Sequence, residues 1–393
     1  MKVKCIDSIS YKTVHLQFNA SLLIMLSNIY EEVIYYVGGS SMKEVNDLLK
    51  KNDITLSNVK RKKLYVYGGE SRVDLLLRYL ISALLNVIVL IKSQKDDVLI
   101  YNFNNLFSLR LINVLNRLYR RKILICCHGE LELITEQPKE GGGFFKCLRF
   151  LAKDFFLKRK HIHEYISFMV LGDIVLKNLR CYLTETQLSH FISIDHPYVF
   201  TKDTKCKNAS RDIDISIGTV GLFNKAKGAD SLLELVKKVK GTNVNFSVTG
   251  RIFYDIERLR NNGVDFVEGA DCKSISQAEY MTRISNLDYI LFLYKRESYR
   301  ITASGAVMDA INLQKPIIAI ENEYFSYLFE KYGSFGMLFH DVEDMSRYLL
   351  ENTISFLKEK SLSYNFSTIQ KALSPQCQAV ILKSKLKQLC LLN

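Results

Sequence analysis

The sequence has little of what would favour disorder, secretion or a simple metal site. It contains only 4 prolines and 19 glycines and no low-complexity tract, so we expect a folded globular chain. Its 9 cysteines include no CxxC pair and no regular spacing, which indicates reduced thiols rather than a disulfide framework or a zinc site. The N-terminal "MKVKCIDSIS" lacks the long apolar segment of a signal peptide, and we therefore expect a cytoplasmic protein.

Long uninterrupted apolar runs are also missing. The nearest candidate, "LLLRYLISALLNVIVLIK" at 75–92, is interrupted by Arg78, and the remainder falls short of the ~18–20 residues that a membrane span requires. We therefore expect a buried helix at this position.

Positive charge is plentiful but uneven. Residues 1–200 hold 28 Lys and Arg against 19 Asp and Glu, whereas the rest of the chain holds 26 against 22, so an anionic partner is expected to meet the first half. The basic runs "KRKKLY" and "RLYRRK" could touch anionic lipid head groups or a lipid diphosphate, or could simply be solvated. No basic stripe is interleaved with aromatic residues, and nucleic acid is not an expected partner.

Short apolar runs of strand type alternate with helical patterns through both halves of the chain. This alternation predicts an α/β protein with two doubly wound, mainly parallel domains, in line with its length. The expected strands are at 31–38, 97–103, 122–129, 168–172, 214–221, 244–250, 264–269, 287–294 and 315–320. The domains should span 1–200 and 213–372, with a polar linker at 201–212.

The final segment, 373–393, has apolar residues at helical spacing together with three lysines that can face solvent. We expect an amphipathic helix. It could pack on the first domain or lie on an anionic membrane, and the shortness of its leucine-rich face favours packing.

Two turns in the second half have the chemistry of a phosphate site. Gly221 follows a strand and Lys227 precedes a helix, although neither a Walker A pattern nor GxGxxG is present. Ser304 and Gly305 should begin a helix whose free N–H groups can hold an anion, and Asp309 lies one turn further on the same face. A carboxylate there could accept hydrogen bonds from a ribose diol. The plain alternatives are a solvated lysine and an ordinary capped helix with an exposed Asp309.

Histidines mark the first half. His128 and Glu130 end a strand, and His196 precedes the linker, where an imidazole could bond a substrate hydroxyl or only serve the structure. His161 and His163 have no third ligand in view, so no metal site is expected there. The loop at 135–146 is either an acceptor lid or disordered.

Taken in order along the chain, these motifs resemble the GT-B glycosyltransferases, in particular glycosyltransferase family 4 of the bacterial surface-polysaccharide type. Gly221-Leu222 followed by Lys227-Gly228 resembles the family's Gly-Arg and Lys-Gly turns, with Leu222 in place of Arg. Asp309 stands where the family has the second Glu of its Glu-x7-Glu motif, and Ile301 stands where the first is expected. Glu297 or Arg300 could compensate for that change.

The resemblance implies two Rossmann-like domains that face a cleft, with named residues in each role. The donor nucleotide sugar would contact Gly221, Lys227, Gly250, Arg251, Glu297, Tyr299, Arg300, Ser304, Gly305 and Asp309. The acceptor would meet His15, Asn19 and His196, while His128, Glu130, Lys227 and Arg300 would carry catalysis.

The implied activity is transfer of a sugar from a nucleotide-diphosphate donor to a saccharide or lipid-linked acceptor in polysaccharide synthesis. The resemblance further implies retention of configuration and no metal or other cofactor. The basic runs add peripheral contact with the anionic inner face of a membrane as an expectation. Two alternatives stay open: a GT-B nucleotide-sugar epimerase, and a catalytically degenerate GT-B scaffold that acts as a binding protein.

Overall fold

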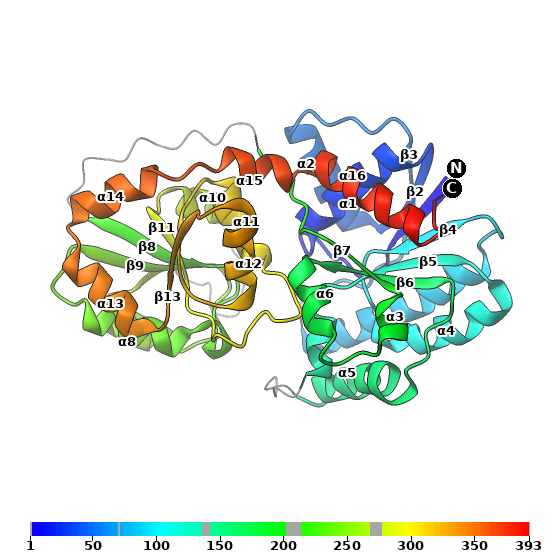
Figure 1. Ribbon diagram of the computed structural model, residues 1–393, viewed down its shortest axis with the longest axis horizontal. Helices are drawn as coiled ribbons and strands as arrows, with labels where there is room; N and C mark the ends of the chain where they lie inside the picture. Colours follow the sequence, from blue (N-terminus) through cyan, green and yellow to red (C-terminus); the bar gives the residue numbers. More distant parts are fainter. Residues whose placement is uncertain (1, 70, 136–141, 202–213, 268–276, 393) are drawn as a thin grey trace. The chain divides into compact units, whose positions relative to one another are not determined.

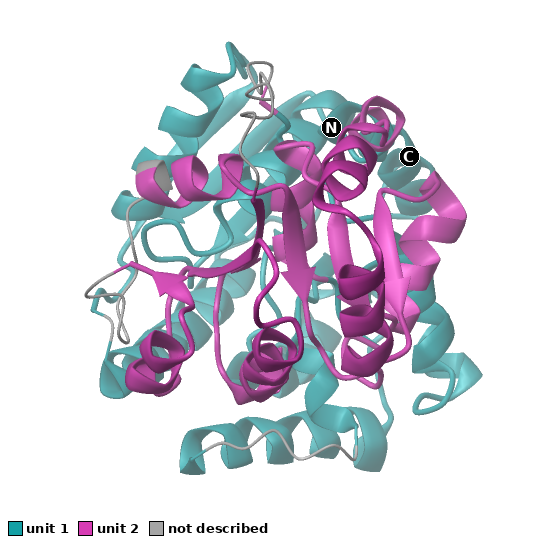
Figure 2. Cartoon of the chain, turned by 90° about the vertical axis from the view of Figure 1, so that its left-hand side faces the viewer, with its two compact units in different colours: residues 1–200, 301–303, 372–393 teal, residues 201–300, 304–371 magenta. Residues whose placement is uncertain are grey.

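Two parallel β-sheets organise the chain, one in each of two structural units. In the computed structural model, unit 1 comprises residues 1–200, 301–303 and 372–393, and unit 2 comprises residues 201–300 and 304–371 (Figure 2). The structure describes residues 2–69, 71–135, 142–201, 214–267 and 277–392. The predicted linker, apart from its first residue, and the centre of the 135–146 loop lie outside the described residues.

Unit 1 is built on seven parallel strands in the order β3-β2-β1-β4-β5-β6-β7. Their bounds are β1 Lys2–Asp7, β2 Glu32–Gly38, β3 Val59–Leu64, β4 Val98–Tyr101, β5 Lys122–Cys126, β6 Ile166–Leu171 and β7 Phe191–Ile194. The strand order reverses at β1, which pairs with both β2 and β4, and ligands of such sheets bind beside this reversal. The four strands predicted in this half are confirmed. The basic run in β3 escaped prediction because it forms an edge strand with mostly exposed side chains, where Lys and Arg discourage further pairing.

Helices cover both faces of this sheet, and each face has its own apolar core. Helices α1, α2 and α16 contribute to one core, and α3 to α6 contribute to the other (Figure 1). The helices of unit 1 are α1 Leu16–Ile29, α2 Gly39–Lys51, α3 Arg72–Ile91, α4 Leu106–Tyr119, α5 Gly143–Lys153, α6 Asp173–Leu179, α7 Glu185–Leu188 and α16 Pro375–Gln388. A 3₁₀ turn at Glu130–Ile134 and a π turn at Asp154–Arg159 complete the unit.

The expectation that the apolar segment near 75–92 is buried is wrong. This segment forms most of α3, and only 28% of its most apolar 18-residue window is buried, although the helix is long and apolar enough to cross a membrane. One side of α3 packs on the core through Val87 and Leu90, whereas Leu80 and Leu84 on another side are exposed. Hydropathy alone does not reveal what covers a helix.

The last helix, α16, belongs to unit 1. Ser374 caps it by accepting a hydrogen bond from the Cys377 backbone N–H at 3.3 Å. Leu382 and Leu386 are fully buried in the core that α1 also fills. Val380, an apolar residue of the same helix, is 71% exposed.

Unit 2 contains six parallel strands in the order β10-β9-β8-β11-β12-β13. Their bounds are β8 Ile215–Val220, β9 Val244–Thr249, β10 Asp265–Phe266, β11 Tyr289–Phe292, β12 Ile317–Ile320 and β13 Gly336–Phe339. Its helices are α8 Ala229–Lys238, α9 Ile256–Asn261, α10 Gln277–Ser285, α11 Gly305–Asn312, α12 Glu323–Tyr332, α13 Val342–Glu351, α14 Ile354–Leu362 and α15 Ser367–Ala372. All five strands predicted here are present. Because the strands are parallel, the turns after β8, β9 and β11 lie at one edge of the sheet.

Candidate functional site

Unit 1 gathers three histidines at the carboxyl edge of its sheet. They lie beyond the ends of β1, β5 and β7 respectively: His15, His128 and His196. The rings of His15 and His128 are 4.3 Å apart, and Phe18 of α1 lies 4.5 Å from His128 and 6.0 Å from His196. The structure thus brings together three of the residues that the sequence singled out.

These imidazoles are neutral near pH 7. Desolvation by burial lowers the pKa of both His15 and His196 to about 4, and the neighbouring His196 adds to the effect on His15. Burial also lowers the pKa of His128 well below its ordinary value. Each ring can therefore act as a hydrogen-bond acceptor or base but does not supply positive charge.

Backbone carbonyls fix the tautomers of two of these rings. His128 Nε2 lies 2.8 Å from the Asn102 carbonyl oxygen, and His196 Nδ1 lies 3.0 Å from the Pro197 carbonyl oxygen. A carbonyl only accepts, so we assign the proton to each of these nitrogens. The other nitrogen, Nδ1 of His128 and Nε2 of His196, keeps a lone pair that suits a sugar hydroxyl.

Glu130 supports the His128 turn. Its carboxylate Oε2 accepts a hydrogen bond from the His128 backbone N–H at 2.8 Å, and the residue is only 8% exposed. Thr302, also in unit 1, donates its hydroxyl to the His128 carbonyl oxygen. Glu130 therefore positions His128 in this structure.

Asn19 lies in a buried network rather than at an accessible surface. It is 1% exposed, and its amide nitrogen donates to Asp7 Oδ2 at 2.8 Å and to Ser10 Oγ at 3.0 Å. Its carbonyl oxygen accepts from the Asn102 amide at 3.2 Å, and Asn102 in turn holds His128. The sequence interpretation missed Asp7, whose pKa is raised by burial, because β1 itself was not predicted.

In unit 2, two strand-ending turns touch at Gly221 and Gly250. Gly250 has φ +143°, and a Cβ atom on it would lie 1.9 Å from the Gly221 carbonyl oxygen, so only glycine fits. A Cβ on Gly221 would lie 4.0 Å from Cβ of Ala306, which places this turn against the start of α11. Ser304, at the N-cap of α11, makes no side-chain cap hydrogen bond. The backbone N–H groups at this helix end are suited to an anion.

Lys227 lies against a stacked pair of tyrosines. Its Nζ lies 4.4 Å from the ring centre of Tyr294 and 4.3 Å from that of Tyr299, and the two rings stack at 4.7 Å. Asn224 fixes the turn by accepting from the Lys227 backbone N–H at 3.0 Å. The partly exposed ammonium therefore contacts two aromatic rings as well as solvent.

Asp309 is half-buried rather than exposed, because α10 packs beside it. The phenol of Tyr280 donates to Asp309 Oδ2 at 2.9 Å. Burial and the Asp309 charge both raise the pKa of Tyr280, so the phenol stays a donor at neutral pH. Sequence reasoning missed Tyr280 and Tyr294, because each meets its partner far along the chain.

The remaining predicted donor residues are more dispersed. Arg300 Nε lies 3.1 Å from Glu323 Oε1, in the first turn of α12. Arg251 stacks over Phe253 at 4.8 Å, and Glu297 is exposed. Of the two family substitutions, Leu222 is 45% exposed and Ile301 is 1% exposed in an apolar cluster of unit 1.

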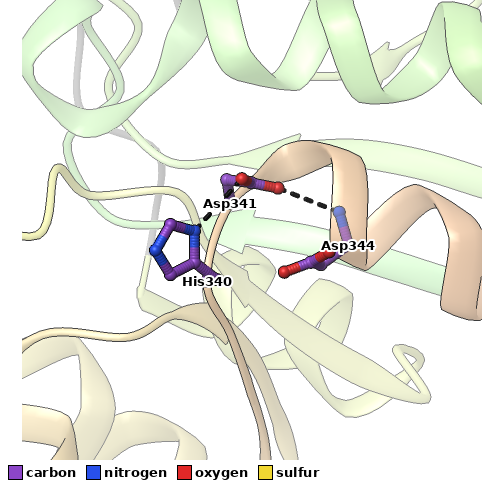
Figure 3. A group of neighbouring side chains, drawn as sticks. All are labelled: His340, Asp341 and Asp344. Atoms are coloured by element: carbon purple, nitrogen blue, oxygen red, sulfur yellow. Dashed lines mark hydrogen bonds and ion pairs between the residues drawn. The ribbon is translucent and has the colours of Figure 1, made fainter.

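Among the described residues, one group of His and carboxylate side chains is close enough to hold a metal ion: His340, Asp341 and Asp344 (Figure 3). Asp341 caps α13 by accepting from the Asp344 backbone N–H at 2.9 Å, and His340 Nδ1 lies 3.2 Å from its other oxygen. Both His340 and Asp341 are exposed. This geometry is that of a helix cap, and we assign no metal to it.

The fold belongs to the GT-B class, with two Rossmann-like units. HepE from Anabaena, solved with UDP and glucose, is similar over 99% of this chain and 98% of its own, with a TM-score of 0.61 and 12% identity. Sucrose-phosphate synthase from Thermosynechococcus elongatus is similar over 99% of both chains, with a TM-score of 0.65 and 12% identity.

The apo form of the lipopolysaccharide outer core galactosyltransferase WaaB is similar over 98% of this chain and 99% of its own, with a TM-score of 0.57 and 12% identity. No protein-family model matches the sequence, and no curated protein is significantly similar to it.

Proposed function

We propose that this chain is a glycosyltransferase that moves a sugar from a nucleotide-diphosphate donor to a saccharide or lipid-linked acceptor. The observation that carries the proposal is in unit 2. There the Gly221 and Gly250 turns meet the start of α11, while Lys227 and Asp309 provide a cation and a carboxylate on neighbouring turns. Phosphate, diphosphate and ribose are the chemical groups that such an edge recognises.

Several further observations support this assignment. HepE, which has the same fold, holds UDP and glucose in its solved structure. In the proposed reaction, Lys227 and the N-terminus of α11 would stabilise the charge that develops on the leaving diphosphate. The neutral His128 ring would accept a hydrogen bond from a hydroxyl of the sugar or the acceptor. Glu130 would hold the backbone turn that carries His128.

The resemblance to family 4 supplies three finer parts of the proposal: retention of configuration, chemistry without a metal ion, and a role in polysaccharide synthesis. A cytoplasmic location beside an anionic membrane rests instead on the cysteine pattern and the basic runs of the sequence. The described cysteines are all unpaired, which suits a reducing compartment.

A nucleotide panel tests the donor site directly. The full chain would be heated with UDP, GDP or ADP, and the nucleotide that binds should stabilise the folded state by about 2.7 kcal/mol at a hundredfold excess over Kd. Release of that nucleotide from its sugar donors, in the presence of saccharide and lipid-linked acceptors, then tests transfer. A folded protein that binds none of these nucleotides would contradict the proposal.

One observation favours a second function. Leu222 and Ile301 replace the Arg and Glu that the family resemblance leads us to expect, and Ile301 is buried among apolar residues. A chain that binds nucleotide but transfers no sugar to any acceptor would be a binding protein on a GT-B scaffold. Equilibrium dialysis together with the transfer assay separates the two.

A further inference from the structure

Helix α3 exposes a continuous apolar stripe. Five of its large apolar side chains are 36% to 65% exposed: Val73, Leu76, Leu80, Leu84 and Ile91. Their spacing of three, four or seven residues places them on one side of the helix. Such a stripe usually packs against another part of a protein or against a different apolar phase.

The opposite side of α3 is fixed to unit 1 by polar contacts. The Arg78 guanidinium donates to the Tyr67 carbonyl at 2.8 Å, and the Ser82 and Ser8 hydroxyls are 2.7 Å apart. Asn86 accepts from Ser8 at 2.7 Å. A helix that crossed a bilayer would have to carry this polar side through hydrocarbon. We conclude that α3 does not span a membrane.

The two helices beside α3 extend the same kind of surface. Leu111, Val114 and Leu118 of α4 are 48%, 49% and 78% exposed, and Phe145 and Phe150 of α5 are 45% and 60% exposed. Helix α3 packs along α4, and α4 contacts α5. Within the described residues, these three helices hold 10 of the 19 exposed large hydrophobic side chains. We call this surface the α3–α5 face.

Aromatic rings join the three helices into one layer. Tyr79 of α3 lies 6.3 Å from Phe107 of α4 and 5.2 Å from Phe144 of α5, and Phe107 stacks with Phe144 at 6.3 Å. The exposed side chains above this layer are therefore held on adjoining, mutually packed helices. Their exposure does not come from separate loops.

The charges of this layer are nearly all positive. Apart from Arg78, which is buried on the opposite side of α3, the segments 72–91, 106–119 and 143–159 contain eight basic residues and only two acidic ones. The eight basic residues are Arg72, Arg110, Arg117, Lys146, Arg149, Lys153, Lys158 and Arg159. Of the carboxylates, Asp74 caps α3, and Asp154 lies 2.7 Å from Arg159 and 4.0 Å from Arg110.

Cationic and apolar groups also occur side by side. The Lys158 ammonium lies 5.5 Å from the ring centre of Phe150, which is itself 60% exposed. Long basic side chains beside aromatic rings are suited to the boundary between lipid head groups and acyl chains. A second copy of the chain would set this basic face against itself, and like charges would repel.

We propose that the α3–α5 face is the surface by which unit 1 docks on an anionic phospholipid bilayer, with α3 lying in the plane of the interface. This proposal names the surface behind the membrane location proposed above, and it does not depend on sugar transfer. It also places the contact away from the basic edge strand β3 and from α16, whose leucines are buried in unit 1.

Sedimentation of the full chain with vesicles tests the docking surface. The vesicles would be pure phosphatidylcholine, or phosphatidylcholine with about one third phosphatidylglycerol. We expect binding to the anionic vesicles at low salt, at least about tenfold weaker binding to the neutral ones, and a clear loss at high salt. No binding to the anionic vesicles would overturn the proposal.

A pair of matched double variants locates the surface. Leu84→Glu with Leu118→Glu places two carboxylates on the α3–α5 face, at positions 60% and 78% exposed. Leu362→Glu with Val380→Glu is the control, because it makes the same change at positions 61% and 71% exposed on α14 and α16. The first pair should lower the partition coefficient at least about tenfold, and the control should leave it unchanged.

Three outcomes would overturn the assignment. In the first, the two double variants lose vesicle binding equally. In the second, only the control loses binding, which would place the membrane contact on α14 or α16. In the third, light scattering would show a wild-type dimer that Leu84→Glu with Leu118→Glu dissociates, which would identify a second copy as the occupant. Melting temperatures of all variants should match the wild type, because each position is exposed.

Discussion

The two units present the same edge of the same kind of sheet, but with opposite chemistry. Unit 1 offers neutral imidazoles, whose pKa values are lowered by burial. Unit 2 offers a lysine, a carboxylate and the start of a helix. The difference teaches that the fold fixes where a site lies, while local desolvation and partner groups decide whether it handles charge or hydroxyl groups.

The largest expected effect comes from disrupting the backbone contact between Gly250 and Gly221 in unit 2. Gly250→Ala would place a Cβ atom 1.9 Å from the Gly221 carbonyl oxygen. We expect the free energy of unfolding to fall by at least about 3 kcal/mol, and nucleotide binding to be lost with it. Gly241→Ala is the control, since φ there is also positive, at +92°, but nothing lies within 4 Å. It should cost only about 1 to 2 kcal/mol. Equal thermal shifts for the two variants would contradict the predicted contact.

Removing the cation of unit 2 should slow transfer more than it weakens binding. In Lys227→Ala the leaving diphosphate loses a charge that matters most in the transition state, and kcat should fall about 100-fold. Lys240→Ala removes an exposed lysine of the same unit and should be silent. Steady-state kinetics and nucleotide titration are compared. A loss of affinity as large as the loss of kcat would assign Lys227 to binding alone.

Acidification should act on unit 1 through its histidines. The pKa values of His15 and His196, about 4 in the folded chain, lie below the ordinary value of about 6.5. The unfolded chain therefore binds more protons between these values. The stabilisation that comes from keeping these histidines neutral is fully present above about pH 6.5. It falls as the pH drops toward 4, by up to about 1.4 kcal/mol in the free energy of unfolding per pH unit for each histidine.

Melting curves over this pH range check the prediction. His15→Gln and His196→Gln should each flatten the dependence, whereas His161→Gln, at an exposed position, should keep the wild-type slope. If the melting temperature depends on pH with the same slope in all three variants, groups outside the histidine cluster cause the acid sensitivity.

A smaller effect is expected from Asp309 of α11, the residue that we propose binds the ribose. Asp309→Asn should weaken nucleotide binding about tenfold, or about 1.4 kcal/mol, because a charged acceptor is lost. Glu359→Gln, on the exposed side of α14, is the control. If Asp309 binds the ribose diol, a 2′,3′-dideoxy nucleotide should bind the wild type and Asp309→Asn equally. A loss that persists with the dideoxy nucleotide would exclude this role.

The smallest effect concerns Tyr280, which acts through Asp309. Tyr280→Phe removes one hydrogen bond of 2.9 Å and should weaken nucleotide binding about two- to tenfold. The effect should vanish in the Asp309→Asn background, because the partner is already changed. Calorimetric titration of the four proteins completes the cycle, and additive losses would show that Tyr280 acts independently.

Local patterns carried most of the fold prediction. Continuous apolar runs marked β2, β4, β5, β11 and β12, because strands buried on both faces are mostly apolar, whereas β8 and β9 mix apolar with polar residues. The strand β1 interleaves lysine with apolar residues, and β3 is largely basic. Neither has the apolar run by which most of the other strands were predicted. Helix α3 was placed correctly but its exposure was not foreseen, since burial depends on neighbours that the segment does not encode.

In the candidate site, too, local features could be predicted from the sequence and contacts between distant residues could not. Gly221, Ser304 and Asp309 could be proposed from spacing, because a turn and the first turns of a helix are local structures. The contact of Asp309 with Tyr280 joins residues 29 positions apart, and sequence periodicity contains no signal for it. Asn19 shows the converse, because it was predicted to meet the acceptor but its amide is used within the protein.

The contact between Gly250 and Gly221 also bears on how related sequences should be interpreted. A side chain at position 250 is excluded by the backbone itself, whatever ligand is present. Selection would therefore retain this glycine even in descendants that had lost catalysis. Lys227 is under no such steric constraint and would drift once transfer ceased to matter. If the chain transfers sugar as proposed, the lineages in a family tree that keep Gly250 but have replaced Lys227 would mark the scaffolds that have lost transfer.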